Sequence, residues 1–235
     1  MILRIKDLQT HIGEFHILQG VSLEVPEGGV TVVLGRNGAG KTTTLRSIMG
    51  LIQTKKGIIE FAGESIMGLP PHLIARKGIG YVPEEQAIFS GLSVEENLRL
   101  AMVKSRDESL LQDVLDSFPD LKDTFHRKAG SLSGGQKQML ALGRALVAGS
   151  RLLLIDEPSK GLAPVIVEKV AEIINGIKNK TTVVLVEQNF RLAQAVGDRY
   201  FIIDDGRTVG SGMMEELVRD IELQQQYLGI SMKKG

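Results

Sequence analysis

Residues 35 to 42 read Gly35-Arg36-Asn37-Gly38-Ala39-Gly40-Lys41-Thr42, which matches the P-loop pattern at every fixed position. The loop follows an apolar run from Thr31 to Leu34 and precedes apolar residues at helical spacing, Leu45 and Ile48. A P-loop requires this order of strand, loop and helix, so a glycine-rich turn without a ligand is the weaker alternative. The sequence therefore predicts a phosphate-binding site within a P-loop NTPase fold.

The parts of this loop have separate physical roles. Its glycines let backbone N–H groups turn inward around phosphate oxygens, and the following helix points its N-terminus at the same anion. Lys41 supplies a full positive charge to the terminal phosphates, and the Thr42 hydroxyl is placed to bind Mg²⁺. We therefore expect ATP and Mg²⁺ as ligands. The expected nucleotide-binding residues within and beside the loop are Gly35, Arg36, Asn37, Gly38, Ala39, Gly40, Lys41, Thr42 and Thr43.

Two adjacent acids, Asp156 and Glu157, end another apolar run that begins at Leu152. At the C-terminal end of a strand beside a P-loop strand, two adjacent acids can have two separate catalytic roles. Asp156 would hold Mg²⁺, and Glu157 would position and activate water as the general base. The alternative is that both acids lie in a solvated turn.

Composition limits the other classes of function. The chain has 235 residues, 43% of them hydrophobic, and its 28 basic and 28 acidic residues give a net charge of zero. No overall field attracts nucleic acid, so we expect no nucleic-acid partner. The absence of cysteine excludes a disulfide framework and a thiolate nucleophile. The four histidines lack metal-site spacing and are interpreted as surface or loop residues: His11, His16, His72 and His126.

The N-terminus and the apolar runs indicate where the protein works. Residues 1–5 alternate like a strand and do not resemble a signal peptide. Apolar runs such as Thr182 to Val186 are far shorter than the roughly 20 residues that cross a bilayer. We expect a cytosolic protein that forms no channel by itself.

Alternation of β-rich runs with helical patterns predicts an α/β fold with a mainly parallel sheet. Leu3 to Val33 reads instead as an antiparallel β layer, and 87–149 as a helical insertion without a strand. We expect a single domain in which 1–86 and 150–235 form the nucleotide-binding core. Asp205-Gly206 predicts a hairpin, and the apolar residues from Met214 to Ile221 predict a final amphipathic helix. The expected strands are Ile2 to Leu8, Val21 to Val25, Val30 to Leu34, Ile58 to Phe61, Ile79 to Val82, Leu152 to Ile155, Thr182 to Val186 and Tyr200 to Ile203. The expected helical patterns are Leu98 to Val103, Leu110 to Phe118, Met139 to Val147 and Ile166 to Ile177.

The segment Leu132-Ser133-Gly134-Gly135-Gln136 narrows the fold to one family. Together with the P-loop and the Asp-Glu strand, in this order and spacing, it resembles the ABC ATPases over essentially the whole chain. The resemblance implies that this signature, Ser133 to Gln136, begins a helix and contacts the γ-phosphate of ATP held by a second subunit. A hydroxyl and unhindered N–H groups at a helix start suit an anion. Taken alone, the segment is also compatible with an ordinary loop.

Other segments match the family with substitutions. Glu84 stands where most members have Gln, in a loop that joins two subdomains and meets the membrane partner; it is a metal-side candidate or only a hinge residue. Gln188 stands where most members have His, so its amide NH₂ can bond to the γ-phosphate region but cannot change charge near neutral pH. The expected catalytic residues are therefore Glu157, Gln188 and Lys41. Ala163 replaces a usual Asp, which removes one polar contact across the dimer.

An aromatic residue that stacks on adenine is usual near residue 12. Ile12 occupies that place here, with Phe15 three positions on. Apolar contact through Ile12 and transfer of the role to Phe15 both stay open, with a slight preference for Phe15.

With these substitutions, the chain resembles the second ATPase subunit of branched-chain amino-acid importers. By analogy, this resemblance implies that the transported substrate is a branched-chain amino acid. The resemblance implies membrane permease subunits, a second ATPase subunit that is identical or a paralogue, and indirectly a solute-binding protein. It places the chain on the inner face of the cell membrane, as a peripheral protein. The alternatives are ATPases of lipopolysaccharide, urea or amide transport, and ABC ATPases of DNA repair, ribosomes or iron–sulfur assembly. A P-loop kinase or nucleotide-binding switch does not account for the signature.

Overall fold

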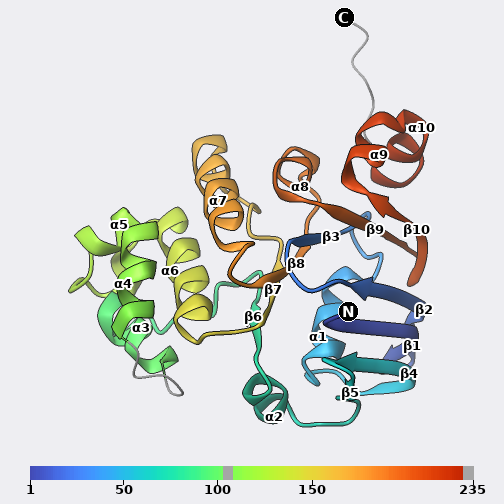
Figure 1. Cartoon of the computed structure of the whole chain (residues 1–235), viewed down its shortest axis with the longest axis horizontal. Coiled ribbons are helices and arrows are strands. Elements are labelled where there is room, and N and C mark those ends of the chain that lie inside the picture. Colours follow the sequence, from blue (N-terminus) through green and yellow to red (C-terminus); the bar gives the residue numbers. More distant parts are fainter. Residues whose placement is uncertain (103–107, 230–235) are drawn as a thin grey trace, which may run out of the picture.

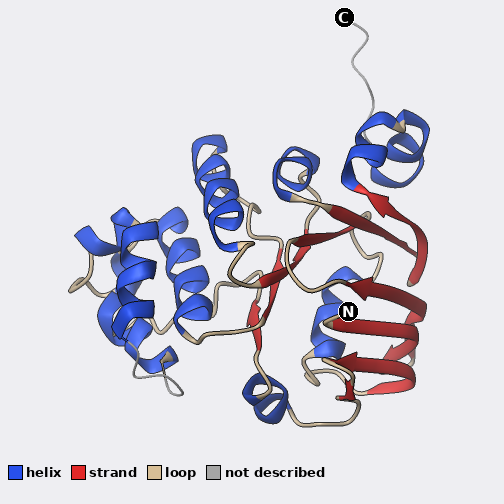
Figure 2. Ribbon diagram, viewed as in Figure 1, coloured by secondary structure: helices blue, strands red, loops and turns tan. Residues whose placement is uncertain are grey.

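The computed structural model describes residues 1–102 and 108–229. Figures 1 and 2 show strands and helices arranged as an α/β fold, which confirms the expected class. The strands are β1 (Leu3–Ile12), β2 (Phe15–Val25), β3 (Val30–Leu34), β4 (Thr54–Phe61), β5 (Glu64–Ser65), β6 (Ile79–Val82), β7 (Leu152–Asp156), β8 (Thr182–Val186), β9 (Arg199–Asp204) and β10 (Arg207–Met213). The α-helices are α1 (Lys41–Ile48), α2 (Pro71–Arg76), α3 (Val94–Ala101), α4 (Glu108–Ser117), α5 (Pro119–Asp123), α6 (Gly134–Val147), α7 (Pro164–Ile177), α8 (Phe190–Val196), α9 (Met214–Arg219) and α10 (Ile221–Leu223). A 3₁₀ turn spans Ala129–Ser131, and a π-helical turn spans Gln224–Leu228.

Five parallel strands form the centre of the fold, in the order β9, β3, β8, β7 and β6. Strands β3, β7 and β8 are buried at every position. Their unbroken apolar runs therefore reflect cover on both faces of the sheet. This arrangement confirms the expected parallel core and brings the P-loop strand next to β8, which in turn pairs with β7.

The N-terminal layer is antiparallel and consists of β1, β2, β4 and β5. The expectation that this layer extends to Val33 is wrong, because β3 pairs in parallel with β8 and β9. The reason is that β3 is the strand that precedes the P-loop, and it lies in the centre of the parallel sheet. The β1–β2 pairing contains register shifts near its tip, between Thr10 and His11.

A hairpin joins β9 to β10 as predicted, with Asp205 at φ +44° and Gly206 at φ +70°. Both residues have the positive φ that a tight type I′ hairpin needs. Strand β10 touches β2 through the pair Arg207 and Gly20, which links the antiparallel layer to the parallel core. The final helix is shorter than predicted: α9 ends at Arg219, and the side chain of Asp220 then caps α10.

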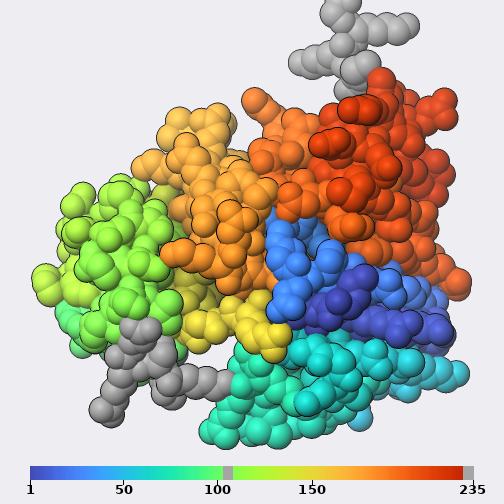
Figure 3. All heavy atoms as spheres, viewed as in Figure 1, coloured from blue at the N-terminus to red at the C-terminus, as the bar shows by residue number. Residues whose placement is uncertain are grey.

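Residues 87–149 contain α3 to α6 and, within the part of this segment that the structure describes, no strand. Figure 3 shows these helices gathered on one side of the molecule, opposite the N-terminal layer. The helical patterns predicted at 98–103, 110–118 and 139–147 correspond to α3, α4 and α6, although Val103 lies outside the described residues. The subdomain boundaries at 86/87 and 149/150 stay a prediction.

Two apolar clusters stabilise the fold, one on each face of the parallel sheet. One joins inward-facing strand residues such as Val32 and Leu185 to helices α3 to α9. The other joins Val33 and Val186 to α1 and the antiparallel layer. Within residues 1–102 and 108–229, no helix has the length and hydropathy that a membrane span requires.

Candidate functional site

The P-loop connects the C-terminal end of β3 to the N-terminus of α1. Its backbone requires glycine at Gly35 and Gly40, which have φ values of +149° and +108°. A Cβ atom at Gly35 would lie 2.1 Å from the Ile203 carbonyl oxygen, and one at Gly40 would lie 2.7 Å from a Leu18 methyl group. The neighbouring strands therefore fix the loop closely, at the strand ends where ligands of open α/β sheets bind.

Lys41 is held inside this loop and is only 4% exposed. Its Nζ donates hydrogen bonds to the carbonyl oxygens of Gly35 at 2.8 Å and Arg36 at 3.0 Å, and lies 3.6 Å from Glu157 Oε1. Burial lowers the pKa of Lys41, and the carboxylate of Glu157 opposes this shift. The ammonium group therefore has a fixed position near the acids, and its carbonyl partners are ones that a phosphate oxygen can replace.

Asp156 ends β7 and is fully buried. One carboxylate oxygen accepts a hydrogen bond from Thr42 Oγ1 at 3.0 Å, and the other accepts one from the Tyr81 hydroxyl at 3.2 Å. Burial raises the pKa of Asp156, while both hydrogen bonds lower it; burial and the nearby Asp156 raise the pKa of Tyr81 to about 12. The Asp156 carboxylate and the Thr42 hydroxyl together offer the hard oxygen atoms that Mg²⁺ prefers.

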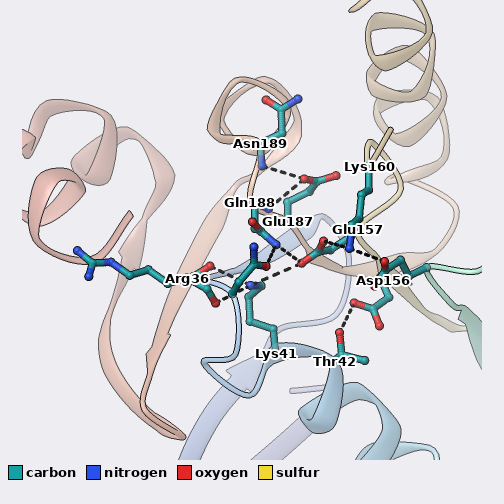
Figure 4. Close-up of polar contacts among 12 residues, drawn as sticks. Arg36, Lys41, Thr42, Asp156, Glu157, Lys160, Glu187, Gln188 and Asn189 are labelled. Carbon is teal, nitrogen blue, oxygen red and sulfur yellow. Dashed lines mark hydrogen bonds and ion pairs between the residues drawn. The ribbon is translucent and has the colours of Figure 1, made fainter. Parts of the chain in front are cut away.

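Glu157 directly follows β7 with a left-handed backbone, at φ +45°. Its N–H donates to the Val186 carbonyl oxygen of β8 at 2.9 Å. A glutamate in this region is conformationally strained, and such strain persists only where surrounding contacts fix the backbone. Here the neighbouring strand fixes it and turns the carboxylate toward Lys41 (Figure 4).

Gln188 completes this cluster from the end of β8. Its side-chain Nε2 donates to Glu157 Oε1 at 2.7 Å and also to Asn37 Oδ1 of the P-loop (Figure 4). The predicted catalytic residues Glu157, Gln188 and Lys41 thus lie in one connected group. Glu157 is the group that can accept a proton, whereas the amide of Gln188 can only donate hydrogen bonds to it.

Glu84 reaches the edge of the same site. Its Oε1 bonds to Lys160 Nζ at 2.6 Å, and Lys160 Nζ lies 4.0 Å from Glu157 Oε2. The charge of Glu84 contributes to the raised pKa of Asp156. The hydrogen bond to Lys160 occupies a carboxylate oxygen that a metal ion would use, and the metal role of Glu84 stays a prediction. Among the residues that the structure describes, no three His, Asp or Glu side chains form a metal cluster.

The signature segment begins α6, as the resemblance implies. Ser133 Oγ accepts from Gln136 N at 3.3 Å, and Gln136 Oε1 accepts from Ser133 N at 3.0 Å, which forms a capping box. Gly134 is exposed with open space around it, whereas Gly135 packs against Ile166. No hydrogen bond or ion pair between described residues joins this segment to Lys41, Asp156 or Glu157. One copy of the chain therefore does not unite the signature with its own P-loop.

Ile12 and Phe15 face each other across the tip of the β1–β2 hairpin. They are 45% and 74% exposed, so both offer apolar surface that the fold leaves uncovered. Which of them contacts adenine stays a prediction. The other expected loop residues, Gly38, Ala39 and Thr43, lie between β3 and the first turn of α1.

Sequence reasoning assigned no role to three residues that border the site, Tyr81, Lys160 and Glu187, and it missed one contact of Arg36. Tyr81 and Lys160 bond to Asp156 and Glu84, respectively, and Arg36 donates from the P-loop to the carbonyl oxygen of Gln226 near the C-terminus. Glu187 lies buried beneath Gln188. A polar residue at the end of an otherwise apolar strand was the available signal for Glu187; the other three contacts depend on tertiary structure.

Comparisons with known proteins agree with this geometry. The ABC transporter family matches residues 18–160. The chain is 41% identical, over 94% of its length and 97% of the relative, to a high-affinity branched-chain amino acid transport ATP-binding protein of Pseudomonas aeruginosa. It is 35% identical, over 91% of each chain, to a lipopolysaccharide export system ATP-binding protein of Escherichia coli.

A solved structure has the same fold. It is the ADP conformation of an ATP-binding cassette of an ABC transporter, with a TM-score of 0.83 and 25% identity over 95% of this chain and 97% of that one. The family match, the close relatives and this fold agree. The chain belongs to the ABC transporter family, as an ATP-binding subunit whose ATPase activity is coupled to transport.

Proposed function

We propose that Glu157 is the general base for ATP hydrolysis and that the transported solutes are branched-chain amino acids. The observation that supports the catalytic assignment is the group formed by Lys41, Glu157 and Gln188 beside the P-loop. Glu157 accepts the proton of the attacking water. Lys41 transfers its hydrogen bonds from loop carbonyls to the terminal phosphates, where positive charge stabilises the developing negative charge.

The donor set beside Lys41 suits the magnesium ion that accompanies ATP. Asp156 and the Thr42 hydroxyl, joined at 3.0 Å, would hold it, and it would neutralise phosphate charge when bound. Tyr81 orients the Asp156 carboxylate by donating to its second oxygen. Gln188 holds Glu157 without a titratable proton of its own, which leaves the carboxylate as the proton acceptor.

A second ATPase subunit would complete the site. The P-loop residues, Asp156 and Glu157 approach the phosphates from one side, and Ser133 to Gln136 lie elsewhere on the same chain. The exposed start of α6 offers N–H groups and a hydroxyl that suit the γ-phosphate held by a partner. We propose that two copies, or one copy and a paralogue, enclose ATP between them.

Membrane permease subunits would dock beside the segment that contains Glu84. A cavity of about 470 Å³ lies there, lined by residues that include Pro83, Gln86, Ala87 and Arg144. The guanidinium of Arg144 lies over the Phe89 ring, which is half exposed. Arg144 donates to the carbonyl oxygen of Ala87, and no acidic side chain among the described residues pairs with it, so the cavity suits an acidic side chain of the permease. The chain would work as a peripheral protein at the cytoplasmic face of the membrane.

The substrate assignment is supported by the 41% identity to the branched-chain amino acid relative, against 35% for the lipopolysaccharide export relative. Lipopolysaccharide export is the second candidate, supported by that 35% identity over 91% of both chains. An importer would also depend on a solute-binding protein that delivers the amino acid to the permease.

Isolation of the chain from detergent-solubilised membranes, followed by identification of the membrane proteins that co-purify, tests both partner and substrate. Uptake of radiolabelled leucine should fall in cells that contain only the Glu157→Gln chain and be restored by the unchanged chain. Unaltered leucine uptake together with defective lipopolysaccharide export would favour the second candidate.

A further inference from the structure

Glu187 is a buried carboxylate that pairs with no cation among the residues that the structure describes. It is 1% exposed and directly follows the last residue of β8. Three backbone N–H groups donate to it, each at 3.0 Å: Ser159 N to Oε1, and Gln188 N and Asn189 N to Oε2. Burial raises the pKa of Glu187, and these hydrogen bonds oppose the shift. Removal of such a carboxylate from water is costly, which indicates that its position serves a purpose other than stability.

The contacts of Glu187 close a ring around the proposed base. Ser159 lies two residues after Glu157, and Gln188 donates its side-chain amide to Glu157. The N–H of Glu187 also donates to the Val33 carbonyl oxygen of the P-loop strand at 3.2 Å. The Glu187 side chain therefore fixes the loop that follows the base and the backbone of the residue that bonds to the base, while the Glu187 backbone joins both to β3.

We infer that Glu187 is a positioning residue for ATP hydrolysis, which fixes the Gln188 backbone so that the Gln188 amide orients the Glu157 carboxylate. This inference rests on the proposed role of Glu157. Glu187 itself does not touch the nucleotide, because its oxygens are directed to backbone N–H groups on the inner side of the site. Its action passes through Gln188 to Glu157.

The three donors explain why a carboxylate is needed here. Both oxygens accept hydrogen bonds, and neither has to donate. In Glu187→Gln, the amide NH₂ would face the N–H of Ser159 or the two N–H groups of Gln188 and Asn189, which loses at least one hydrogen bond. In Glu187→Asp, the charge remains, but the side chain is one methylene too short to reach both segments.

The test is a double-mutant cycle on steady-state ATP hydrolysis by the full-length chain, with Glu187→Gln, Gln188→Ala and the double variant. Glu187→Gln should lower kcat by about 10- to 100-fold, because small misplacements of reacting groups cost up to about 10²-fold. KM for MgATP should change by less than about threefold, since P-loop binding is unaffected. The double variant should be no slower than the slower single variant, because both changes disable one connected unit.

Two controls separate this inference from simple destabilisation. Glu172→Gln, at an exposed position of α7, should leave kcat unchanged. Glu187→Asp keeps the charge, and its kcat should fall as far as that of Glu187→Gln. If the Glu187→Gln protein does not fold, Glu187→Asp takes its place in the test. A thermal melt of each variant shows whether the protein assayed is folded.

An unchanged kcat in both Glu187 variants would overturn the inference, as would single effects that multiply in the double variant. A loss of kcat in Glu187→Gln without any loss in Gln188→Ala would also overturn it, because Glu187 would then not act through Gln188. Failure of the proposed role of Glu157 would be seen separately, because Glu157→Gln would then retain hydrolysis in the same assay.

Discussion

The side-chain amide of Gln188 donates a hydrogen bond to Glu157 Oε1 across 2.7 Å, between the ends of two neighbouring parallel strands. Because an amide does not titrate near neutral pH, it orients the carboxylate without competing for the proton of an attacking water. Glu157 and Gln188 therefore have distinct roles that can be tested separately.

Replacement of Glu157 by Gln should abolish most hydrolysis and leave MgATP binding nearly intact. The change deletes the proton acceptor but spares Lys41, Thr42 and Asp156, so kcat should fall by about 10²–10⁴-fold. Lys41→Ala should lose binding itself. Steady-state hydrolysis and equilibrium binding of a fluorescent ATP analogue measure the two effects. Hydrolysis within a few-fold of the unchanged chain would show that Glu157 is not the base.

Gln188→His should introduce a dependence on pH near neutrality. An imidazole titrates near pH 6.5, and a neighbouring carboxylate raises its pKa because it stabilises the charged form. The rate profile of the variant should therefore gain a limb around neutral pH that the unchanged chain lacks. Gln194→His, at an exposed position of α8, is the matched control and should not alter the profile. Identical profiles for Gln188→His and the unchanged chain would mean that this position is remote from the chemistry.

The strands of the core and the ends of three of them could be predicted from local sequence. Apolar runs, typical of strands covered on both faces, predicted β3, β7 and β8. The P-loop pattern predicted that Lys41 and Thr42 lie at the phosphate site. The C-terminal ends of adjacent parallel strands lie at one edge of the sheet, so the acids at the end of β7 were expected near the P-loop. The geometry agrees: Thr42 and Asp156 lie within hydrogen-bond distance.

Contacts that depend on tertiary packing were beyond sequence reasoning. The sequence gives no sign that Lys160 bonds to Glu84, although this contact alters the surroundings of the expected metal-side acid. Val30 to Val33 was assigned to the antiparallel layer because local pattern does not reveal which strand a segment pairs with. The three backbone donors to Glu187 come from two separate loops, so no local pattern predicts these hydrogen bonds.

Tyr81→Phe should make Mg²⁺-dependent nucleotide binding more sensitive to acid. The Tyr81 hydroxyl lowers the pKa of Asp156 by donating to its carboxylate, whereas burial raises it. Loss of the hydroxyl removes the opposing effect, so the pKa of Asp156 rises and its ionised form is lost at a higher pH as the solution is acidified. MgATP affinity measured across acidic to neutral pH should show this shift toward higher pH. Tyr200→Phe, buried in β9, should not produce it.

Glu157→Gln should form a dimer that depends on MgATP, whereas the chain without nucleotide or with MgADP should be mainly monomeric. In one copy, the phosphate site is enclosed from the side of β3 and β7, while the signature begins α6 and, within the described part of the chain, makes no hydrogen bond or ion pair with Lys41, Asp156 or Glu157. ATP then stabilises the closed dimer through its higher affinity for that state, and ADP lacks the phosphate that the signature would contact. Light scattering of the three samples measures their masses.

Ser133→Arg should prevent this dimer while monomer nucleotide binding stays largely unchanged, because a long side chain blocks the γ-phosphate of the partner site. The change also removes the α6 cap, a loss of about 1 kcal/mol. Ser93 caps α3 with the same kind of capping box, so Ser93→Arg is the matched control, and its dimer should persist. A dimer that survives Ser133→Arg would disprove the role of the signature. If Glu157→Gln without the Ser133 change stayed monomeric in MgATP at concentrations far above the nucleotide Kd, a paralogous partner would be favoured. The phosphate site would then receive its signature from the paralogue and not from a second copy of this chain.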